Sequence, residues 1–186
     1  EVSGELSASP VDVLGLSALR GLFSAVVDEP ITFVNAPAVA GERGVTHEVV
    51  TETESPNHRS QVDVRAFFAD GSIVNVAGTL TGPKQVQKIV NINGRNFDLR
   101  AEGRNLLVSY TDQPGSLGRF TSILGNHGVS IAAVMQKAGG GAVDGFVPVV
   151  ALTDPAVEAN LEQALDEITA VGVVSERPTR LRLLRA

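Results

Sequence analysis

The hydrophobic and polar positions of residues 104–186 predict six short elements in the order β-α-β-β-α-β. Leu106, Val108 and Tyr110 alternate with polar residues, which is the period of a strand with one buried face. The apolar positions 117, 120, 123 and 124 then recur at helical spacing. The whole order is typical of a ferredoxin-like α+β sandwich.

The remaining elements of this half follow from the same patterns. We expect strands over 129–134 and 146–152, a glycine-rich hairpin loop over 139–145, and a last strand from residues 173–174 and 181–184. Asp154 predicts the N-cap of the second helix, with Pro155 at its first position. Pro148 does not fit a central strand, because proline cannot donate to the ladder, so it predicts a bulge or a different register.

The junction between the first strand and the first helix, residues 110–120, organises this half. Pro114 suits the first turn of a helix, and Gly115 lets the backbone approach another group closely. The N–H groups at such a helix start attract anions, including the carboxylate of a small ligand. We therefore predict that the N–H groups near Gly115, Ser116 and Leu117 can hold a carboxylate.

Residues 1–102 predict a mixed α/β domain. Ser9 and Pro10 open a helix whose apolar face runs from residue 11 to 26, and a second short helix follows from Asn35 to about Arg43. Strands are expected over 1–7, 31–34, 46–54, 60–68, 72–80 and 97–100, with a hairpin turn at 69–71 and a tight turn at 92–96. Residues 84–91 are compatible with either a helix or a strand.

The length and composition fit two small packed domains, which we divide as 1–102 and 103–186. The chain has 186 residues, 43% of them hydrophobic and 19% charged, which argues against disorder. The net charge of −6 disfavours a nucleic-acid-binding surface, and no apolar stretch approaches a membrane span. The absence of cysteine excludes disulfides and zinc–thiolate sites, and we predict no metal site. A cytoplasmic location fits this composition.

Three cations, Lys88, Arg95 and Arg100, lie within thirteen positions after a region poor in cations. Guanidinium groups recognise phosphate or carboxylate through paired N–H donors, and a lysine adds a point charge. If the three side chains converge, they suit a phosphorylated small acid. If they are separate charges that face solvent, the same spacing arises without any binding site. From the spacing alone, the surface interpretation is preferred.

The motifs identify a family. The pattern D-x-P-G-x-L-G (112–118), followed by G-V-x-I-x-A (128–133), resembles an ACT domain, an amino-acid-sensing module, from about residue 103 onward. The segments V-D-V-L-G-L-S-A-L-R-G-L-F-S (11–24), F-V-N-A-P (33–37), S-P-N-H-R-S (55–60) and I-N-G-R-x-F-D-L-R-A-x-G (92–103) are similar to the intervening domain before it. Together they resemble the C-terminal half of long-form D-3-phosphoglycerate dehydrogenases of the actinobacterial kind.

This resemblance implies a regulatory fragment. The family's enzymes oxidise 3-phosphoglycerate to 3-phosphohydroxypyruvate with NAD, at the start of serine biosynthesis. The chain itself has no G-x-G-x-x-G after a strand, and its three histidines, His47, His58 and His127, are scattered. We therefore expect no catalytic residue and no cofactor in this chain; NAD would belong to an N-terminal catalytic half that is missing here.

The resemblance also implies two ligand sites. L-serine would lie between two ACT domains of a homodimer or tetramer, contacted by Tyr110, Asp112 and Ser130 in addition to the helix start. Asp112 can accept from its ammonium group, and Tyr110 offers a hydroxyl. An asparagine is usual where Ser130 stands, so we expect a weaker site. The alternative is that Asp112 only caps the helix and Tyr110 only packs its ring.

Lys88, Arg95 and Arg100 match the family's second site, which binds phosphate or a phosphorylated hydroxy acid. A further cation that some members carry in the third ACT strand falls near Val150 and is missing.

Two other functions stay open. The chain can be an amino-acid sensor or assembly module that acts without a catalytic partner. It can also be the regulatory part of an L-serine dehydratase, although an ACT domain at the C-terminal end favours the dehydrogenase.

Overall fold

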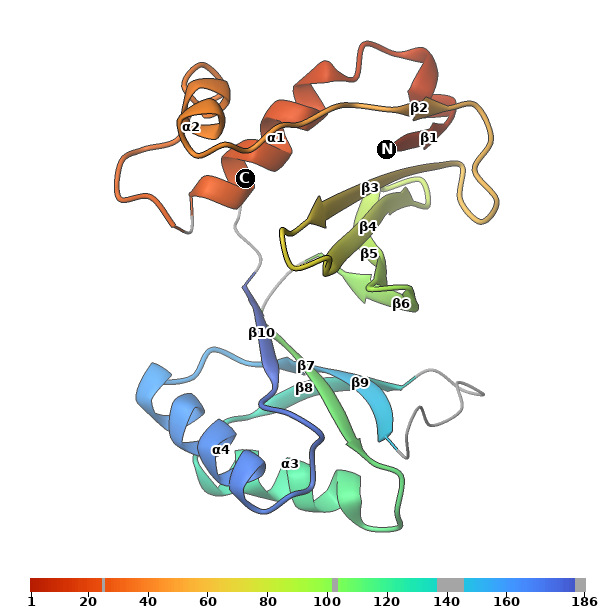
Figure 1. Cartoon of the computed structure of the whole chain (residues 1–186). Coiled ribbons are helices and arrows are strands. Elements are labelled where there is room, and N and C mark those ends of the chain that lie inside the picture. Colours follow the sequence, from red (N-terminus) through yellow and green to blue (C-terminus); the bar gives the residue numbers. More distant parts are fainter. Residues whose placement is uncertain (25, 102–103, 137–145, 183–186) are drawn as a thin grey trace. The chain divides into compact units, whose positions relative to one another are not determined.

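The computed structural model describes residues 1–24, 26–101, 104–136 and 146–182. The chain divides into two compact units, Glu1–Arg100 and Ala101–Ala186 (Figure 1). The boundary expected between residues 102 and 103 falls outside the described residues. Both units combine helices with a mixed or antiparallel sheet, so the α+β prediction is confirmed. None of the described helices combines the length and the hydropathy that a membrane crossing requires.

Unit 1 contains a six-stranded sheet in the order β2-β1-β3-β4-β5-β6. Its strands are β1 (Val2–Gly4), β2 (Thr51–Glu52), β3 (Ser60–Phe67), β4 (Ile73–Thr81), β5 (Val86–Ile92) and β6 (Arg95–Arg100), and a 3-10 turn, η1 (Glu5–Ala8), follows β1. Residues 84–91, which the pattern left open, mostly form a strand. Of the strand expected over 46–54, only Thr51–Glu52 is present.

Two tight hairpins set the register of this sheet. At the β3–β4 turn, Asp70 Oδ1 accepts hydrogen bonds from the Ser72 N–H (2.8 Å) and the Ser72 hydroxyl (2.6 Å). At the β5–β6 turn, Asn93 and Gly94 both have positive φ, 49° and 77°. Two such residues form the turn that matches the twist of paired strands, so the tight turn expected over 92–96 is the turn of a β-hairpin.

The two helices of unit 1, α1 (Asp12–Phe23) and α2 (Ala36–Glu42), bury Leu19, Phe23, Ile31, Ala36 and Ala40 together. The strand expected over 31–34 is wrong. Asn35 Oδ1 accepts from the Thr32 N–H (2.7 Å) and hydroxyl (3.0 Å), and the Ala36 N–H donates to Thr32 O. These local bonds fold the segment into a turn that leads into α2.

Unit 2 is an antiparallel sheet in the order β10-β7-β9-β8, with two helices on one face (Figure 1). Its elements are β7 (Arg104–Thr111), α3 (Ser116–Asn126), β8 (Ile131–Gln136), β9 (Phe146–Thr153), α4 (Glu158–Ala170) and β10 (Thr179–Arg182). The ferredoxin-like prediction is confirmed. The core is one cluster that includes Leu106, Val108, Phe120, Leu124, Leu165 and Ile168. The predicted loop over 139–145 lies outside the described residues.

The start of the second helix of unit 2 was predicted wrongly. It begins at Glu158, and its N-cap position is Val157 rather than Asp154. The preceding residues stay extended because the Asp154 N–H donates to Ser130 O (3.0 Å) and Arg104 Nη1 donates to Ala156 O (2.9 Å). These two bonds tie the segment to strands β7 and β8, so the helix starts one turn later.

Pro148 does lie in the central strand β9, in continuous register with β7, where it faces Ser109. The Ser109 carbonyl accepts from the Ser175 N–H (2.9 Å), on the side away from β9. Ser109 therefore directs its N–H and C=O away from β9. No carbonyl of β7 points at Pro148, so the N–H that proline lacks leaves no acceptor of β7 unpaired. The register irregularity of this sheet lies instead in β8, between Ile131 and Ala133.

Candidate functional site

The junction between β7 and α3 forms a closed turn. Thr111, the last residue of β7, donates from its N–H (2.9 Å) and its hydroxyl (3.2 Å) to Val173 O. The Gln113 N–H donates to Thr111 O (2.8 Å), and the Ser116 N–H donates to Gln113 O (3.1 Å). Gly115 occupies the N-cap position with φ of 89°, a conformation that favours glycine. The sequence D-Q-P-G-S therefore fixes where the helix N-terminus points.

A cavity of about 280 Å³ opens at this turn. It is bordered by the turn itself, by the first helical turn of α3 and by the segment after α4. The lining residues are Thr111, Gln113, Pro114, Gly115, Ser116, Arg119, Gly172 and Val173. The predicted carboxylate cradle at Gly115 and Ser116 thus borders a space in which a small molecule fits.

Backbone and side-chain donors at this turn are available to an anion. Within the part of the chain that the structure describes, the N–H groups of Gly115 and Leu117 have no hydrogen-bond partner, and neither has the Arg119 guanidinium. The Ser116 N–H, in contrast, is used inside the turn. A helix N-terminus combined with a guanidinium recognises carboxylates well. Arg119 was not predicted from the sequence. Its spacing of four residues from Gly115, one helical turn, is the signal that could have identified it.

The Asp112 carboxylate is exposed and makes no capping hydrogen bond to α3. The alternative that Asp112 caps the helix is therefore wrong. Gly115 holds the N-cap position, and no side chain among the described residues caps this helix. Asp112 thus leaves an acceptor without an internal partner directly before the turn.

Tyr110 packs its ring into the core and is only 6% exposed. Its hydroxyl donates to Gln136 Oε1 at 2.7 Å. Because a phenol oxygen that donates one bond can still accept another, Tyr110 retains an acceptor. The partner Gln136, at the end of β8, was not predicted; its place at the same end of the sheet as Tyr110 follows only from the topology.

Ser130 lies far from the other predicted contacts within one chain. Strands β7 and β8 are both antiparallel to β9, so they run in the same direction. Tyr110 at the end of β7 pairs with Val147, whereas Ile131 at the start of β8 pairs with Thr153. Six residues along a strand correspond to roughly 20 Å. Ser130 therefore lies at the opposite end of the sheet from the β7–α3 turn.

Two of the three predicted cations of unit 1 are neighbours. Lys88 on β5 faces Arg100 on β6, on the same side of the sheet, and the Lys88 ammonium forms an ion pair with Asp98. Arg95, at the start of β6, faces Ile92 instead. It lies five residues from Arg100, which is roughly 16 Å along a strand, and the alternation of side chains directs it to the other face. The structure therefore groups Lys88 with Arg100 and separates Arg95.

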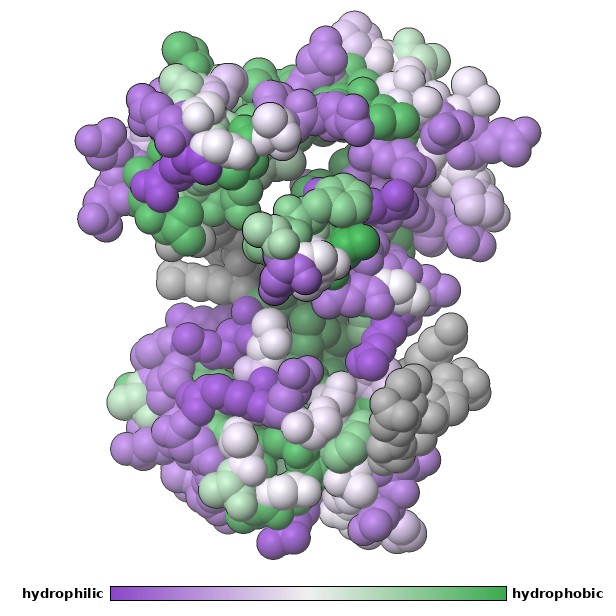
Figure 2. Space-filling model, in the orientation of Figure 1, coloured by the Kyte–Doolittle hydropathy of each residue, from purple (hydrophilic) through white to green (hydrophobic). Residues whose placement is uncertain are grey.

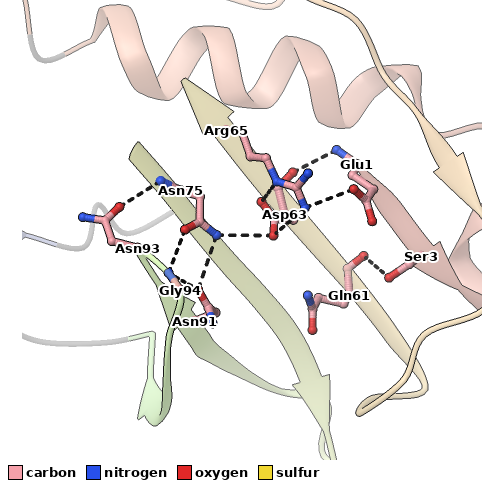
Figure 3. Close-up of polar contacts among 9 residues, drawn as sticks. All are labelled: Glu1, Ser3, Gln61, Asp63, Arg65, Asn75, Asn91, Asn93 and Gly94. Carbon is pink, nitrogen blue, oxygen red and sulfur yellow. Dashed lines mark hydrogen bonds and ion pairs between the residues drawn. The ribbon is translucent and has the colours of Figure 1, made fainter. Parts of the chain in front are cut away.

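The face that carries Lys88 and Arg100 continues into a polar network (Figure 3). The Asp63 carboxylate accepts from Arg65 Nε (3.2 Å) and from Asn75 Nδ2 (3.4 Å). The hydrogen bond to Asp63 raises the pKa of the Arg65 guanidinium above its ordinary value. Asn75 Oδ1 accepts from the Gly94 N–H (3.0 Å), and Asn75 Nδ2 also donates to Asn91 Oδ1 (3.3 Å). Sequence reasoning missed this network because its members come from three strands, β3, β4 and β5, and from the β5–β6 turn.

The structure contains no group of three or more histidine, aspartate or glutamate side chains suited to a metal ion within the described residues. The histidines make structural contacts where contacts are seen: His127 Nε2 lies 2.7 Å from Glu167 Oε2 and links α3 to α4. The chemistry that the two units offer is therefore recognition of small charged molecules.

Comparison with known proteins agrees with this geometry. Residues 1–93 match the family described as the D-3-phosphoglycerate dehydrogenase intervening domain, and residues 104–170 match the ACT domain family. D-3-phosphoglycerate dehydrogenase of Mycobacterium leprae (strain TN) is 63% identical over 132 residues, which are 71% of this chain and 25% of that protein. The same enzyme of Mycobacterium tuberculosis (strain ATCC 25618 / H37Rv) is 63% identical over 133 residues, 72% of this chain and 25% of that protein.

A more distant relative, D-3-phosphoglycerate dehydrogenase of Bacillus subtilis (strain 168), is 27% identical over 77% of this chain and 27% of its own length. Among solved structures, a homoserine dehydrogenase from Thiobacillus denitrificans is 28% identical over 48% of this chain and 20% of that chain, with a TM-score of 0.38. The chain spans about a quarter of the length of the curated relatives it matches.

Proposed function

The chain belongs to the family of the D-3-phosphoglycerate dehydrogenase intervening domain and carries an ACT domain, and from this premise we propose that it is the regulatory part of such an enzyme. The oxidation of 3-phosphoglycerate with NAD would take place in polypeptide beyond these residues. The chain itself would bind L-serine, the end product, as a feedback effector. The observation that supports this most strongly is the pairing of unused anion donors with an unused carboxylate at the β7–α3 turn.

The turn offers donors for an anion at the helix start and a carboxylate, Asp112, directly before it, which together suit a zwitterion. The ligand's carboxylate would accept from the N–H groups of Gly115 and Leu117 and from the Arg119 guanidinium, all without partners among the described residues. Its ammonium group would donate to Asp112, which directly precedes the turn. Charge-assisted hydrogen bonds of this kind are about twice as strong as neutral ones. An amino acid satisfies both sides, whereas a simple acid or amine satisfies only one.

Ser130 takes part only if two copies associate. Because it lies at the far end of the sheet from the turn, a second copy related by a two-fold axis must supply it. A two-fold pair of ACT domains then holds two equivalent ligands, each between the turn of one copy and Ser130 of the other. This arrangement makes the effector a bridge, so ligand binding favours the associated state by its differential affinity.

A phosphorylated acid is the second ligand that we propose, at Lys88 and Arg100. These side chains are cross-strand neighbours on the polar face of unit 1, and a phosphate group presents enough oxygens for both. Asp98 already neutralises part of the Lys88 charge, so the ligand competes with an internal ion pair. Arg95 can join only from another copy, because its position on β6 separates it from the pair.

Calorimetric titration of the chain with L-serine tests the effector site, with D-serine as the stereochemical control and sedimentation to follow association. We expect saturable binding of L-serine, weakened at least tenfold by Asp112→Ala and by Arg119→Gln. A tenfold change in affinity corresponds to about 1.4 kcal/mol, less than the usual value of a charged hydrogen bond.

Glu54→Ala is the matched control, because it removes an exposed carboxylate from the other unit. Equal affinity for both enantiomers, or no effect of Asp112→Ala, contradicts the proposed site. A titration with phosphate and 3-phosphoglycerate, repeated with Lys88→Gln, tests the second ligand in the same way.

A further inference from the structure

The β5–β6 turn contains Asn93 and Gly94, the one Asn-Gly pair in the sequence. Both residues are exposed to solvent, as are the apolar side chains Phe67 and Ile73 at the tip of the neighbouring β3–β4 hairpin (Figure 2). An asparagine deamidates most readily when glycine follows it, because glycine has no Cβ to obstruct the approach of its backbone nitrogen to the asparagine side chain. By sequence, this turn is therefore the position in the chain that is chemically most prone to deamidation.

Deamidation at this pair is a ring closure followed by hydrolysis. The Gly94 backbone nitrogen loses its proton to a base in solution and attacks Cγ of Asn93, which closes a succinimide ring. The bond from Cγ to Asn93 Nδ2 breaks, and this nitrogen takes up a proton and leaves as ammonia. Water then opens the ring at either of its carbonyl groups and gives aspartate or isoaspartate. The reaction consumes water and involves no oxidation or reduction.

Two side chains hold the nitrogen that makes this attack. The Gly94 N–H donates to Asn75 Oδ1 and to Asn91 Oδ1, both at 3.0 Å (Figure 3). Asn75 is itself fixed, because its Nδ2 donates to Asp63 Oδ2 (3.4 Å). Asn91 is fixed in the same way by the bond from its Nδ2 to Asn96 Oδ1 (2.8 Å). The Gly94 nitrogen must lose both acceptors before it can attack, and the loss of these hydrogen bonds adds to the barrier.

The carbonyl group that is attacked faces β4. Asn93 Oδ1 accepts from the Asn75 N–H, and the Asn93 N–H donates to Asn75 O, both at 2.9 Å. The Asn75 N–H can stabilise the negative charge that develops on Oδ1 during the attack. Among the described residues, no acceptor lies within hydrogen-bond distance of the leaving group, Asn93 Nδ2, and the residue is exposed to water.

We propose that Asn93 is a deamidation site that the polar network of unit 1 keeps unreactive in the folded chain. The Asn93 carbonyl already has a donor for the developing charge, so the bonds from the Gly94 N–H to Asn75 and Asn91 form the barrier. The site becomes reactive when the β5–β6 turn separates from Asn75. This inference goes beyond the proposed function and depends on neither of the two proposed ligands.

The modification changes the turn permanently. Asn93 and Gly94 both have positive φ, and a two-residue turn of this kind matches the twist of its two strands. Isoaspartate continues the chain through the side-chain carbonyl and adds a methylene to the backbone, so the turn loses this geometry. Aspartate keeps the backbone length but replaces a neutral amide with a negative charge. Because neither product reverts to asparagine, their amount records how often the turn has opened.

Mass spectrometry of the 186-residue chain tests the proposal, after the chain has been aged at mildly alkaline pH and digested. Conversion of the amide to an acid raises the mass of the peptide that contains Asn93. We expect Asn75→Ala to deamidate at least about tenfold faster than the wild-type chain, which corresponds to about 1.4 kcal/mol. The substitution removes one acceptor of the Gly94 N–H and loosens the other, but it keeps the backbone N–H that bonds to Asn93 Oδ1.

Two controls separate the network from general loss of stability. Asn96→Ala removes an asparagine from the same row of side chains but leaves both acceptors of the Gly94 N–H in place. The wild-type chain in urea, at the concentration that gives it the same free energy of unfolding as Asn75→Ala, controls for unfolding. If Asn75→Ala deamidates no faster than either control, the proposal is overturned, because the hydrogen bonds to Gly94 are then not the barrier.

Asn91→Ala provides a second and milder test, with amide hydrogen exchange of Gly94 measured on the same samples. This substitution removes one acceptor and leaves Asn75 in place. We expect exchange of the Gly94 amide and deamidation of Asn93 to accelerate together. Faster exchange without faster deamidation contradicts the proposal. Neither measurement involves L-serine or phosphate, so a failure of the proposed ligand sites leaves this test unaffected.

Discussion

The two units stabilise their sheets in different ways. In unit 2, α3 and α4 cover one face of the sheet, and the apolar side chains of strands and helices form one continuous core. In unit 1, the buried cluster joins α1 to α2 and the segments between them rather than to the sheet. The sheet of unit 1 buries apolar side chains of its own, among them Ala77, Ile89 and Leu99, and also contains the polar network around Asp63 and Asn75 (Figure 3).

The two kinds of interaction depend differently on the presence of individual partners. A continuous core stabilises a unit without further contacts, because burial of apolar area is non-directional and sums over many residues. A polar network depends on every partner being present, because an unpaired buried polar group costs free energy. Unit 1 also leaves Phe67, Phe68 and Val64 exposed. Among the described residues, the large exposed apolar side chains therefore lie mostly in unit 1.

The largest expected effect is the loss of a core side chain in unit 2. Phe120 on α3 is fully buried in the core cluster of unit 2, and Phe120→Ala should lower the free energy of unfolding of unit 2 by about 3–5 kcal/mol. The matched change in unit 1, Phe67→Ala, removes a side chain that is 73% exposed and should cost less than about 1 kcal/mol in the isolated chain. Urea unfolding followed at probes in each unit measures both.

If Phe120→Ala and Phe67→Ala lower the free energy of unfolding by similar amounts, the proposed difference between the two units is wrong. They would mean that the end of the β3–β4 hairpin is already buried in the isolated chain, for example by self-association.

The elements of unit 2 were predictable because its patterns are local. Alternation in 104–111 and helical spacing in 117–124 each reflect one buried face, and the structure places that face on the core. The errors arose where a local bond overrode the pattern. Asn35 folds residues 32–36 into a turn, and Arg104 holds Ala156 in an extended segment ahead of α4. Neither partner choice can be read from spacing alone.

The candidate site residues divide in the same way: those set by local sequence were predicted, and those set by the fold were not. Gly115 and Ser116 were found because a strand, a turn and a helix start are contiguous in sequence. Arg119 and Gln136 were missed, because their relation to the turn depends on helix rotation and on strand order. The separation of Ser130 from Tyr110 is likewise a property of the sheet's topology. Sequence reasoning can name such residues from a family, but only the fold shows that one chain cannot bring them together.

The second prediction concerns the polar network of unit 1. Asp63 is 8% exposed, and Asp63→Ala leaves Asn75 and Arg65 without their shared acceptor. We expect a loss of about 1–3 kcal/mol in the free energy of unfolding of unit 1, with no change in unit 2. Asp98→Ala is the control, because it removes a carboxylate that is 75% exposed from its pair with Lys88, worth about 0–1 kcal/mol.

If Asp63→Ala costs no more than Asp98→Ala, the network does not hold the sheet. The stability of unit 1 would then come from its hairpins and from the cluster around Phe23.

The third prediction is a smaller effect on the surface of unit 2. Arg177 forms ion pairs with Glu162 and Asp166 on α4, and the hydrogen bond to Asp166 raises the pKa of the guanidinium. Because these groups are exposed, Arg177→Ala should lower the melting temperature only slightly, and this effect should shrink at high salt. Thermal unfolding at low and high salt measures it. A larger, salt-independent loss would show that Arg177 acts through packing of its stem.

The smallest expected effect is a pH dependence at the β3–β4 turn. Hydrogen bonds from the Ser72 hydroxyl and N–H lower the pKa of the Asp70 carboxyl below its ordinary value. A carboxyl whose pKa is lowered in the folded state stabilises it fully above the ordinary value, and this contribution is lost as pH falls through the lowered pKa. Ser72→Ala removes only the hydroxyl, so an NMR titration should show the pKa of Asp70 rising part of the way back. Ser17→Ala, whose hydroxyl bonds to Val13 O, should leave it unchanged. An unchanged pKa in Ser72→Ala would assign the shift to the backbone N–H alone, and the hairpin would then owe its acid sensitivity to turn geometry that any residue at position 72 except proline supplies.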